Sequence, residues 1–331
     1  MRNKNRVIDK TFLSADHADE RVIRHRDQIA HAFRWAHVAR YLSQNHRYKD
    51  TILLEAGCGI EQPLAKMLYS NRLIVKSYVG ADANKLEIAE MLRGKKLPIT
   101  LWSQTDFSAL QPEHVGLPAC QIGDSHGPAT DDGYVLPNVF VCTEVAEHVE
   151  PLHCRNLFKH ALEITSEDCH YFISTPVWDR VNAAENHLNE VTAEAFGAML
   201  EDLGYHVVGM WGTFASQKDY TPTMEKEYPG ITTIFNKLHE YYDSTVLSVI
   251  FAPLFPMQSR NIFWHLTRKK GDAAKQERLF DSLLSQPAPW TMHPDWFQLS
   301  GYTHRHTDAC LASADGHNAE PMCGKEGVFL P

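Results

Sequence analysis

The segment from residue 51 to residue 60 combines an apolar run with residue types that suit binding of a nucleotide-like group. It reads T-I-L-L-E-A-G-C-G-I and places Glu55 before Gly57 and Gly59. Two glycines separated by one residue let the chain turn sharply and bring bare backbone against a ligand. A second apolar run ends in Asp82, whose carboxylate can accept hydrogen bonds from both hydroxyls of a ribose. These residues together predict a pocket for an adenosine-containing cofactor.

A second group of chemically capable residues follows a later apolar run, in V-F-V-C-T-E-V-A-E-H. If the chain enters a helical turn after Thr143, the side chains of Glu144, Glu147 and His148 lie on one face, at positions i, i+3 and i+4. Two carboxylates and an imidazole that converge in this way need a positive or protonated group among them. A divalent cation, a substrate amine or a sulfonium would each satisfy them, and His187 is a further candidate ligand.

The glycine segment resembles motif I and the acidic loop of class I S-adenosylmethionine-dependent methyltransferases, whose pattern is acidic-x-Gly-x-Gly-x-Gly. The third glycine of that pattern is Glu61 in this chain. The resemblance implies S-adenosylmethionine as the cofactor, and it implies that Asp106 lies near the adenine amino group, although an exposed turn explains the same letters. The implied cofactor-binding residues are Glu55, Gly57, Gly59, Asp82, Asp106 and Thr143.

A dinucleotide-binding dehydrogenase is the nearest rival, because its fingerprint also places glycines after a first strand and an acid about 20 residues further on. That fingerprint would require a glycine at Gln62. A pyrophosphate at the start of the next helix would also face Glu55 and Glu61, which repel an anion and suit a cationic sulfonium. The methyltransferase interpretation is therefore favoured over the dehydrogenase and over a structural turn that binds nothing.

The E-x-x-E-H group with a later histidine resembles two kinds of methyltransferase: O-methyltransferases of the ubiquinone pathway and 2′-O-methyltransferases of small-RNA 3′ ends. The second resemblance implies a magnesium or manganese ion held by Glu144, Glu147, His148 and His187. The same motif also occurs in methyltransferases without a metal, where the glutamate faces the cofactor and the histidine is a base or packs. We favour the metal-free interpretation, with His148, His187 and Glu144 as the candidate catalytic residues.

The family resemblance implies an α/β fold with a doubly wound, mostly parallel seven-stranded sheet, and the apolar blocks that alternate with helical patterns agree with it. The family resemblance implies that the last two strands form an antiparallel hairpin. The expected strands are residues 51–56, 77–82, 98–103, 139–142, 170–174, 206–211 and 261–267. The expected helices are residues 16–44, 63–69, 86–93, 152–164 and 192–203.

The chain divides into an N-terminal helical leader (1–50), a methyltransferase domain (51–270) and a loosely structured tail (271–331) that contains a short helical pattern at 276–284. A long loop is expected at 111–137. An aromatic-rich insertion at about 213–260 is either extra core or a substrate lid. The tail contains residues that suit zinc, but they lack the close pairs of structural zinc sites: His304, His306, Cys310, His317 and Cys323.

Composition narrows the function classes. The chain has 331 residues, a net charge of -9 and seven cysteines. It has no C-x-x-C pair, no long apolar run and no apolar signal segment, so a cytoplasmic protein with reduced thiols is expected. The negative charge disfavours nonspecific coating of nucleic acid.

We therefore expect methyl transfer from S-adenosylmethionine to an oxygen or nitrogen of a small or nucleotide-like acceptor. Metal-dependent ribose 2′-O-methylation of RNA ends is the first alternative. A catalytically silent protein that keeps the fold in order to bind a ligand is the second. The sequence gives no indication of the oligomeric state.

Overall fold

A seven-stranded sheet with the strand order β3-β2-β1-β6-β7-β9-β8 forms the centre of the molecule. The computed structural model describes residues 26–121, 129–178, 187–214, 224–226, 228–242 and 244–268. The strands are β1 (Ile52–Ala56), β2 (Ser77–Asp82), β3 (Ile99–Ser103), β6 (Val139–Thr143), β7 (His170–Pro176), β8 (Tyr205–Phe214) and β9 (Asn261–Arg268). Only β9 runs against its neighbours in this sheet. The predicted doubly wound sheet and its antiparallel edge are confirmed.

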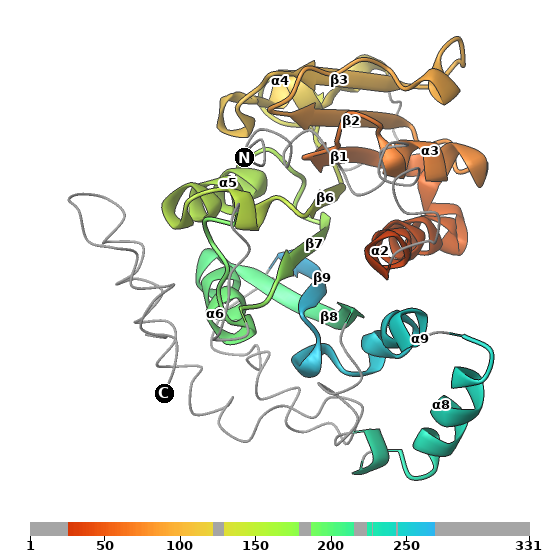
Figure 1. Ribbon diagram of the computed structural model, residues 1–331. Coiled ribbons are helices and arrows are strands. Elements are labelled where there is room, and N and C mark those ends of the chain that lie inside the picture. Colours follow the sequence, from red (N-terminus) through yellow and green to blue (C-terminus); the bar gives the residue numbers. More distant parts are fainter. Residues whose placement is uncertain are drawn as a thin grey trace, which may run out of the picture.

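Helices cover both faces of the sheet (Figure 1). On one face lie α2 (Arg26–Ser43) and α3 (Pro63–Ser70), and on the other lie α5 (Pro151–Glu163) and α6 (Ala193–Leu203). Successive strand residues alternate between the faces, since Leu53 packs with the α2 and α3 side chains and Leu54 packs with those of α5 and α6. Both faces are therefore apolar, as the unbroken hydrophobic runs predict.

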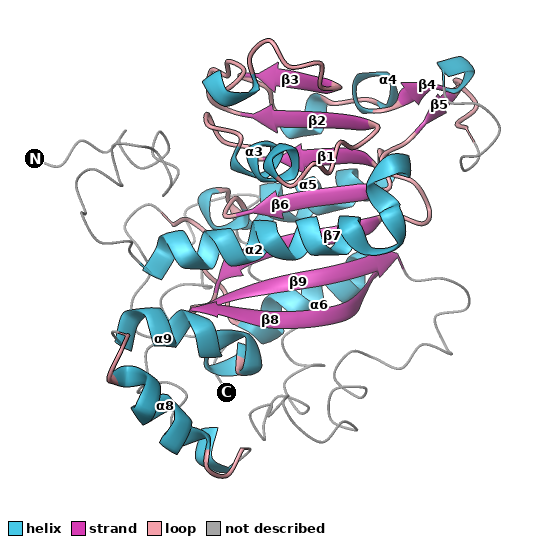
Figure 2. Ribbon diagram, turned by 90° about the vertical axis from the view of Figure 1, so that its right-hand side faces the viewer, coloured by secondary structure: helices cyan, strands magenta, loops and turns pink. Residues whose placement is uncertain are grey.

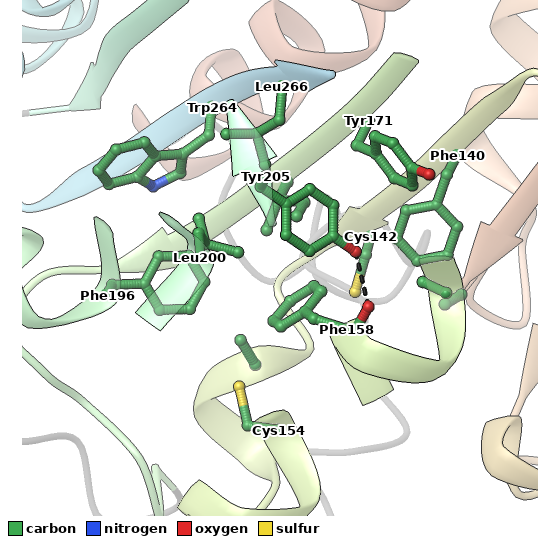
Figure 3. Packing of buried hydrophobic residues seen from close by; sticks show 14 of the residues in the cluster. Phe140, Cys142, Cys154, Phe158, Tyr171, Phe196, Leu200, Tyr205, Trp264 and Leu266 are labelled. Carbon is green, nitrogen blue, oxygen red and sulfur yellow. Dashed lines mark hydrogen bonds between the residues drawn. The ribbon is translucent and has the colours of Figure 1, made fainter. Parts of the chain in front are cut away.

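The core beneath α5 and α6 is aromatic (Figure 3). Phe158 of α5 and Phe196 of α6 meet edge to face at 5.8 Å, and Tyr171 of β7 and Tyr205 of β8 meet in the same way at 4.9 Å. The hydroxyl of Tyr205 donates a 2.7 Å hydrogen bond to the carbonyl oxygen of Phe158. This bond ties α5 to the start of β8 and leaves no unpaired phenol in the core.

The predicted helix at 86–93 is wrong. Only the 3₁₀ turn Glu90–Leu92 forms there. The amide of Leu86 donates to Ser103 Oγ, and the amide of Ala89 donates to Gln62 Oε1. Because side chains from other elements satisfy these backbone groups, the segment gains nothing by closing helical hydrogen bonds.

The predicted loop at 111–137 contains short regular pieces. They are α4 (Pro112–Val115) and a two-stranded hairpin of β4 (Leu117–Pro118) and β5 (Tyr134–Val135), with residues 122–128 outside the described part. The insertion between β8 and β9 contains α8 (Ile231–His239) and α9 (Ser244–Phe251) (Figure 2). It has an apolar cluster of its own, formed by Met224, Phe235, Leu247, Phe251 and Phe255.

Several expectations concern residues that the structure does not describe. The leader helix is described from Arg26 onward, so residues 16–25 lie outside. The tail helix expected at 276–284 and the tail histidines and cysteines also lie outside the described residues. Among the helices that are described, none has the length and apolar character needed to span a bilayer.

Candidate functional site

The candidate site lies at the carboxyl ends of β1, β2, β6 and β7, which are parallel and finish at the same edge of the sheet. The strand order reverses here, because β2 lies on one side of β1 and β6 lies on the other. A crevice outside the strand ends at such a reversal is where open α/β sheets bind ligands. The topology therefore brings the glycine loop, Asp82 and the E-x-x-E-H segment to one edge.

The glycine loop adopts the conformation that its two glycines predict. Gly57 and Gly59 have φ angles of +73° and +70°. A Cβ on Gly57 would lie 2.2 Å from Cγ2 of Val145, so this glycine admits the segment after β6 into close contact. The amide of Gly57 donates a 2.8 Å hydrogen bond to the carbonyl oxygen of Ala81, which fixes the loop against the end of β2.

Asp82 connects the glycine loop to β2. Its Oδ2 accepts a 2.9 Å hydrogen bond from the amide of Gly59. Its Oδ1 accepts from both the backbone and the side-chain nitrogen of Asn84, each at 2.9 Å. A carboxylate offers about four acceptor positions, so Oδ2 keeps capacity for a ribose hydroxyl. The site residue expected to bind ribose is thus held in place by its neighbours.

Gln62 is a structural residue of the loop that sequence reasoning missed. It has φ +42° and ψ +58°, and it is 1% exposed. Its Nε2 donates to the carbonyl oxygens of Gly59, Ile60 and Glu87. Pro63 signals only that Gln62 should leave the right-handed helical region, and the extended conformation is the usual result. The left-handed conformation of Gln62 was therefore not predictable from the local sequence, and it accompanies the bonds by which the side-chain amide closes the loop.

The expectation that Glu55 and Glu61 present two charges to the ligand is wrong. Glu55 is 1% exposed and accepts a hydrogen bond from the hydroxyl of Tyr78. Burial raises the pKa of Glu55 to about 8, so this group is largely uncharged at neutral pH. Glu61 is paired with Lys66. The electrostatic argument against a pyrophosphate therefore fails, and the case against it depends on the missing glycine at Gln62.

Asp106 and Thr143 remain candidates, and Phe107, the residue after Asp106, lies in the core. Asp106 Oδ1 accepts from the backbone amide and the hydroxyl of Ser108, at 2.9 and 2.8 Å, and these bonds lower the pKa of Asp106. Phe107 is buried and packs edge to face against Phe140 at 5.8 Å. Phe107 is therefore not free to stack on a base. Thr143 is half-buried at the last position of β6.

The chain does not enter a helical turn directly after Thr143, and the predicted i, i+3, i+4 alignment is wrong. Glu144 has φ +58°, and a 3₁₀ turn follows at Ala146–His148. The left-handed residue redirects the chain so that Val145 enters the space beside Gly57. A reversal at Glu144 separates its side chain from those of Glu147 and His148.

Glu144 is held by three elements that are distant in sequence. Its Oε1 lies 3.1 Å from Nη1 of Arg34 in α2. The same oxygen accepts 2.8 Å hydrogen bonds from Ser174 of β7 and Asn261 of β9. Burial, the largest single effect, would raise the pKa of Glu144, but the Arg34 guanidinium, His31 and the hydrogen bonds from Asn261 and Ser174 together lower it to about 2. Glu144 is therefore an ionised, paired carboxylate.

Three of the four predicted metal ligands do come together. Ligand atoms of Glu147, His148 and His187 lie within 4.8 Å of one another, and the rings of the two histidines meet edge to face at 5.0 Å. The amides of Leu188 and Asn189 donate to the carbonyl oxygen of Glu147 at 2.7 and 3.2 Å. These bonds hold the segment that begins at His187 against the 3₁₀ turn. Glu144 is not part of this group.

The cluster has the donor chemistry of a cation site. Glu147 is 1% exposed, and its Oε2 has no hydrogen-bond partner among the described residues. Burial, with the nearby charge of Glu144, raises the pKa of Glu147. An unpaired buried oxygen is costly, and one carboxylate with two imidazoles suits manganese, iron or zinc. The residues present therefore fit a divalent ion.

Glu190 is a second residue that the sequence reasoning missed. Its carboxylate contacts Nδ1 of His187, and its side chain is 8% exposed. A carboxylate at one ring nitrogen places the other, Nε2, toward a metal or a substrate proton. The available signal was the H-x-x-E spacing, which places the two side chains within reach after a short turn.

Comparisons with known proteins found similar solved structures only. No protein-family model and no curated protein matches the chain. A magnesium protoporphyrin IX methyltransferase from Synechocystis PCC 6803 with bound SAH is 12% identical, with a TM-score of 0.42 over 80% of this chain and 93% of that chain. A small RNA methyltransferase is 14% identical, with a TM-score of 0.43 over 73% of this chain and 25% of that chain.

A third solved structure is an S-adenosylmethionine-dependent methyltransferase from Clostridium acetobutylicum ATCC 824. It is 10% identical, with a TM-score of 0.42 over 77% of this chain and 98% of that chain. The fold assignment itself depends on the seven-stranded order and on the single antiparallel strand, β9. By these features the chain has the Rossmann-like, doubly wound methyltransferase fold.

Proposed function

We propose that the protein is an S-adenosylmethionine-dependent methyltransferase that acts on an oxygen or nitrogen of a small or nucleotide-like acceptor. The observation that carries the proposal is the pairing of the glycine loop with Asp82 at the strand-order reversal, where the Gly59 amide bonds Asp82 Oδ2 at 2.9 Å. The left-handed conformations of Gly57 and Gly59 form the tight turn against which the cofactor would lie. The carboxylate of Asp82 would accept from its ribose.

Methyl transfer is an in-line displacement at the sulfonium methyl, and positioning supplies most of the acceleration. The acceptor must lose a proton as its oxygen or nitrogen attacks. We infer that His148 or His187 takes that proton, since both lie at the same edge of the sheet, with their rings 5.0 Å apart. Glu190 contacts Nδ1 of His187 and so favours Nε2 as its reactive atom.

The test is calorimetry on the full chain with S-adenosylhomocysteine and, separately, with NADH. We expect binding of the first and none of the second. We also expect Asp82→Asn to weaken the binding by tenfold or more, because the amide is a poorer acceptor for the ribose hydroxyls. Asp131→Asn, at an exposed position, is the matched control. Heat with NADH alone would support the dehydrogenase, and heat with neither would support the silent binding protein.

The cluster of Glu147, His148 and His187 supports a second candidate, metal-assisted methylation of a ribose hydroxyl. A divalent ion bound there would supply Lewis-acid polarisation that lowers the pKa of the hydroxyl. The buried, unpaired Oε2 of Glu147 is the observation that favours this version. His148 and His187 would supply two nitrogen ligands beside this carboxylate.

Chelation separates the two versions. Metal-assisted transfer predicts that methylation of RNA 3′ ends stops after exhaustive chelation and returns with manganese, and that His187→Ala abolishes manganese binding. Methyl transfer that persists after chelation, with His187→Ala still active, would contradict it and leave the metal-free enzyme. His153→Ala, at an exposed position on α5, is the control for loss of a histidine elsewhere.

A further inference from the structure

A buried arginine, Arg34, is the positively charged partner of Glu144. Arg34 of α2 is 0% exposed. Its Nη1 lies 3.1 Å from Glu144 Oε1 and also donates to Oδ1 of Asn261 at 3.2 Å and to Oγ1 of Thr213 at 3.4 Å. The guanidinium therefore sits where the ends of β6, β8 and β9 meet, and it is delivered there by a helix outside the sheet.

The backbone conformation of Glu144 keeps its side chain out of the cluster of Glu147, His148 and His187, although Glu144 is close to two of these residues in the sequence. It precedes Glu147 by three residues, yet its φ of +58° turns its side chain toward Arg34, Ser174 and Asn261. A left-handed conformation is unfavourable for a residue with a Cβ. It persists because the three partners hold the carboxylate in place.

The Glu144 carboxylate is partly enclosed, with 18% of its side chain exposed, and its contacts with Arg34, Ser174 and Asn261 all involve Oε1. Removing a charged partner from an enclosed carboxylate is unfavourable unless another cation replaces it. When Arg34 is present, Glu144 is already paired and has no need of a further cation. When the guanidinium is removed, a divalent ion at the neighbouring cluster of Glu147, His148 and His187 becomes the available counter-charge.

We propose that Arg34 competes with a metal ion for Glu144. By pairing with Glu144, Arg34 keeps this carboxylate out of the cluster of Glu147, His148 and His187. Docking of α2 therefore lowers the affinity of the cluster for divalent ions. The proposal rests on the metal-assisted version of the proposed function. It makes α2 a regulatory element of the site, because release of α2 would add a fourth protein ligand.

The experiment is titration of the full chain with Mn²⁺, followed by electron paramagnetic resonance of the free ion. We expect Arg34→Gln, which keeps a hydrogen-bond donor but removes the charge, to tighten Mn²⁺ binding by tenfold or more. Arg34→Lys keeps the charge and should stay within threefold of the wild type. The double variant Arg34→Gln with Glu144→Gln should lose the gain. Arg93→Gln is the surface control, since Arg93 is 61% exposed in its pair with Glu87.

Each outcome of the titration either supports or overturns the competition between Arg34 and the metal ion. No tightening in Arg34→Gln, or a gain that survives Glu144→Gln, overturns the proposal. If Arg34→Gln does not fold, Glu144→Gln alone is decisive: it should change wild-type Mn²⁺ affinity by less than threefold, whereas a tenfold loss means that Glu144 is already a ligand. Absence of Mn²⁺ binding in the wild type and in Arg34→Gln also overturns it. Calorimetry with S-adenosylhomocysteine on the same samples tests the proposed function separately.

Discussion

Gly57 and Val145 form one structural unit, although they come from loops after different strands. The side chain of Val145 occupies the space in which a Cβ of residue 57 would lie, 2.2 Å from its Cγ2. The loop after β1 and the loop after β6 therefore pack directly against each other. The glycine is thus required by its neighbour as well as by its own φ angle of +73°.

Experiment can separate the two requirements for glycine at position 57, which are the positive φ angle and the contact with Val145. Gly57→Ala should lower the free energy of unfolding by about 2–4 kcal/mol, the sum of left-handed strain and overpacking. Gly94→Ala is the matched control, because Gly94 has φ +69° and nothing within 4 Å of an added Cβ. It should cost only the strain, about 1–2 kcal/mol. Urea unfolding of both variants measures the difference, and equal losses would show that the contact with Val145 adds nothing.

Glu190 is expected to act through His187. Its carboxylate contacts Nδ1 of His187 and thereby fixes the ring. Glu190→Gln should weaken Mn²⁺ binding by about 10- to 100-fold, which is the usual effect of losing a partner of a ligating histidine. Paramagnetic resonance titration measures the affinity. Glu163→Gln, which removes the exposed partner of His160, is the matched control. Mn²⁺ affinity that does not change in Glu190→Gln would exclude this positioning role.

At the scale of elements, α2 packs on the sheet with histidines as well as apolar side chains. The ring of His37 lies 4.2 Å from that of Trp211 and 5.4 Å from that of Phe263. Burial, with Arg40 nearby, lowers the pKa of His37 to about 4. On β9, burial and the neighbouring His170 lower the pKa of His265 to about 3. Docking of α2 therefore requires uncharged imidazoles.

The stability that these neutral histidines contribute should fall as the pH is lowered from about 6.5 toward 4. In the unfolded chain these histidines take up protons near pH 6.5. In the folded chain His37 takes up its proton only near pH 4, because its pKa is lowered to about 4. Because the unfolded state binds more protons in this window, acid favours it. Urea midpoints at pH 7.5 and 5 should show a smaller fall for His37→Phe than for the wild type. His153→Phe, at an exposed position, is the control, and equal falls in all three proteins would contradict the role of His37.

The sequence correctly predicted those parts of the fold that are determined by residues close together in the chain. The apolar runs that give β1, β2, β6 and β7 are buried on both faces, so their letters alone indicate strands. The same holds for the glycine loop, because a left-handed turn selects glycine. Where the sequence prediction was wrong, the cause lies in contacts between distant segments.

Glu144 shows this most clearly. Its conformation depends on Arg34 and on Asn261, which is 117 positions away in the chain. A spacing rule for side chains on a helix cannot include such partners. Likewise, Gln62 holds backbone groups of Glu87 and Ala89 that the local pattern assigns to a helix. His187 lies beside Glu147 and His148, as the motif resemblance led us to expect, and the spacing rule alone did not indicate this proximity.

For the molecule as a whole, the packing predicts unequal stability. The two cores that flank the sheet are extensive, whereas the insertion has a separate cluster in which Phe235 is the one buried residue of α8. Its outer residues are exposed, with Ile234 at 58%. Segments with few buried apolar contacts open without global unfolding. The insertion is therefore expected to open independently of the sheet.

Hydrogen exchange with and without Phe235→Ala tests this division. In the wild type, amides of α8 should exchange faster than those of β1, β6 and β7. The strand amides should exchange only through openings that approach global unfolding. Removing a buried phenyl ring costs about 3–5 kcal/mol, so exchange of α8 and α9 should rise by roughly a hundredfold or more until it reaches the unprotected rate. Strand exchange should stay unchanged, because Phe235 lies in neither of the sheet cores. If strand amides accelerate together with those of α8, the insertion and the sheet unfold as one unit, and a lid that moves independently of the sheet is excluded.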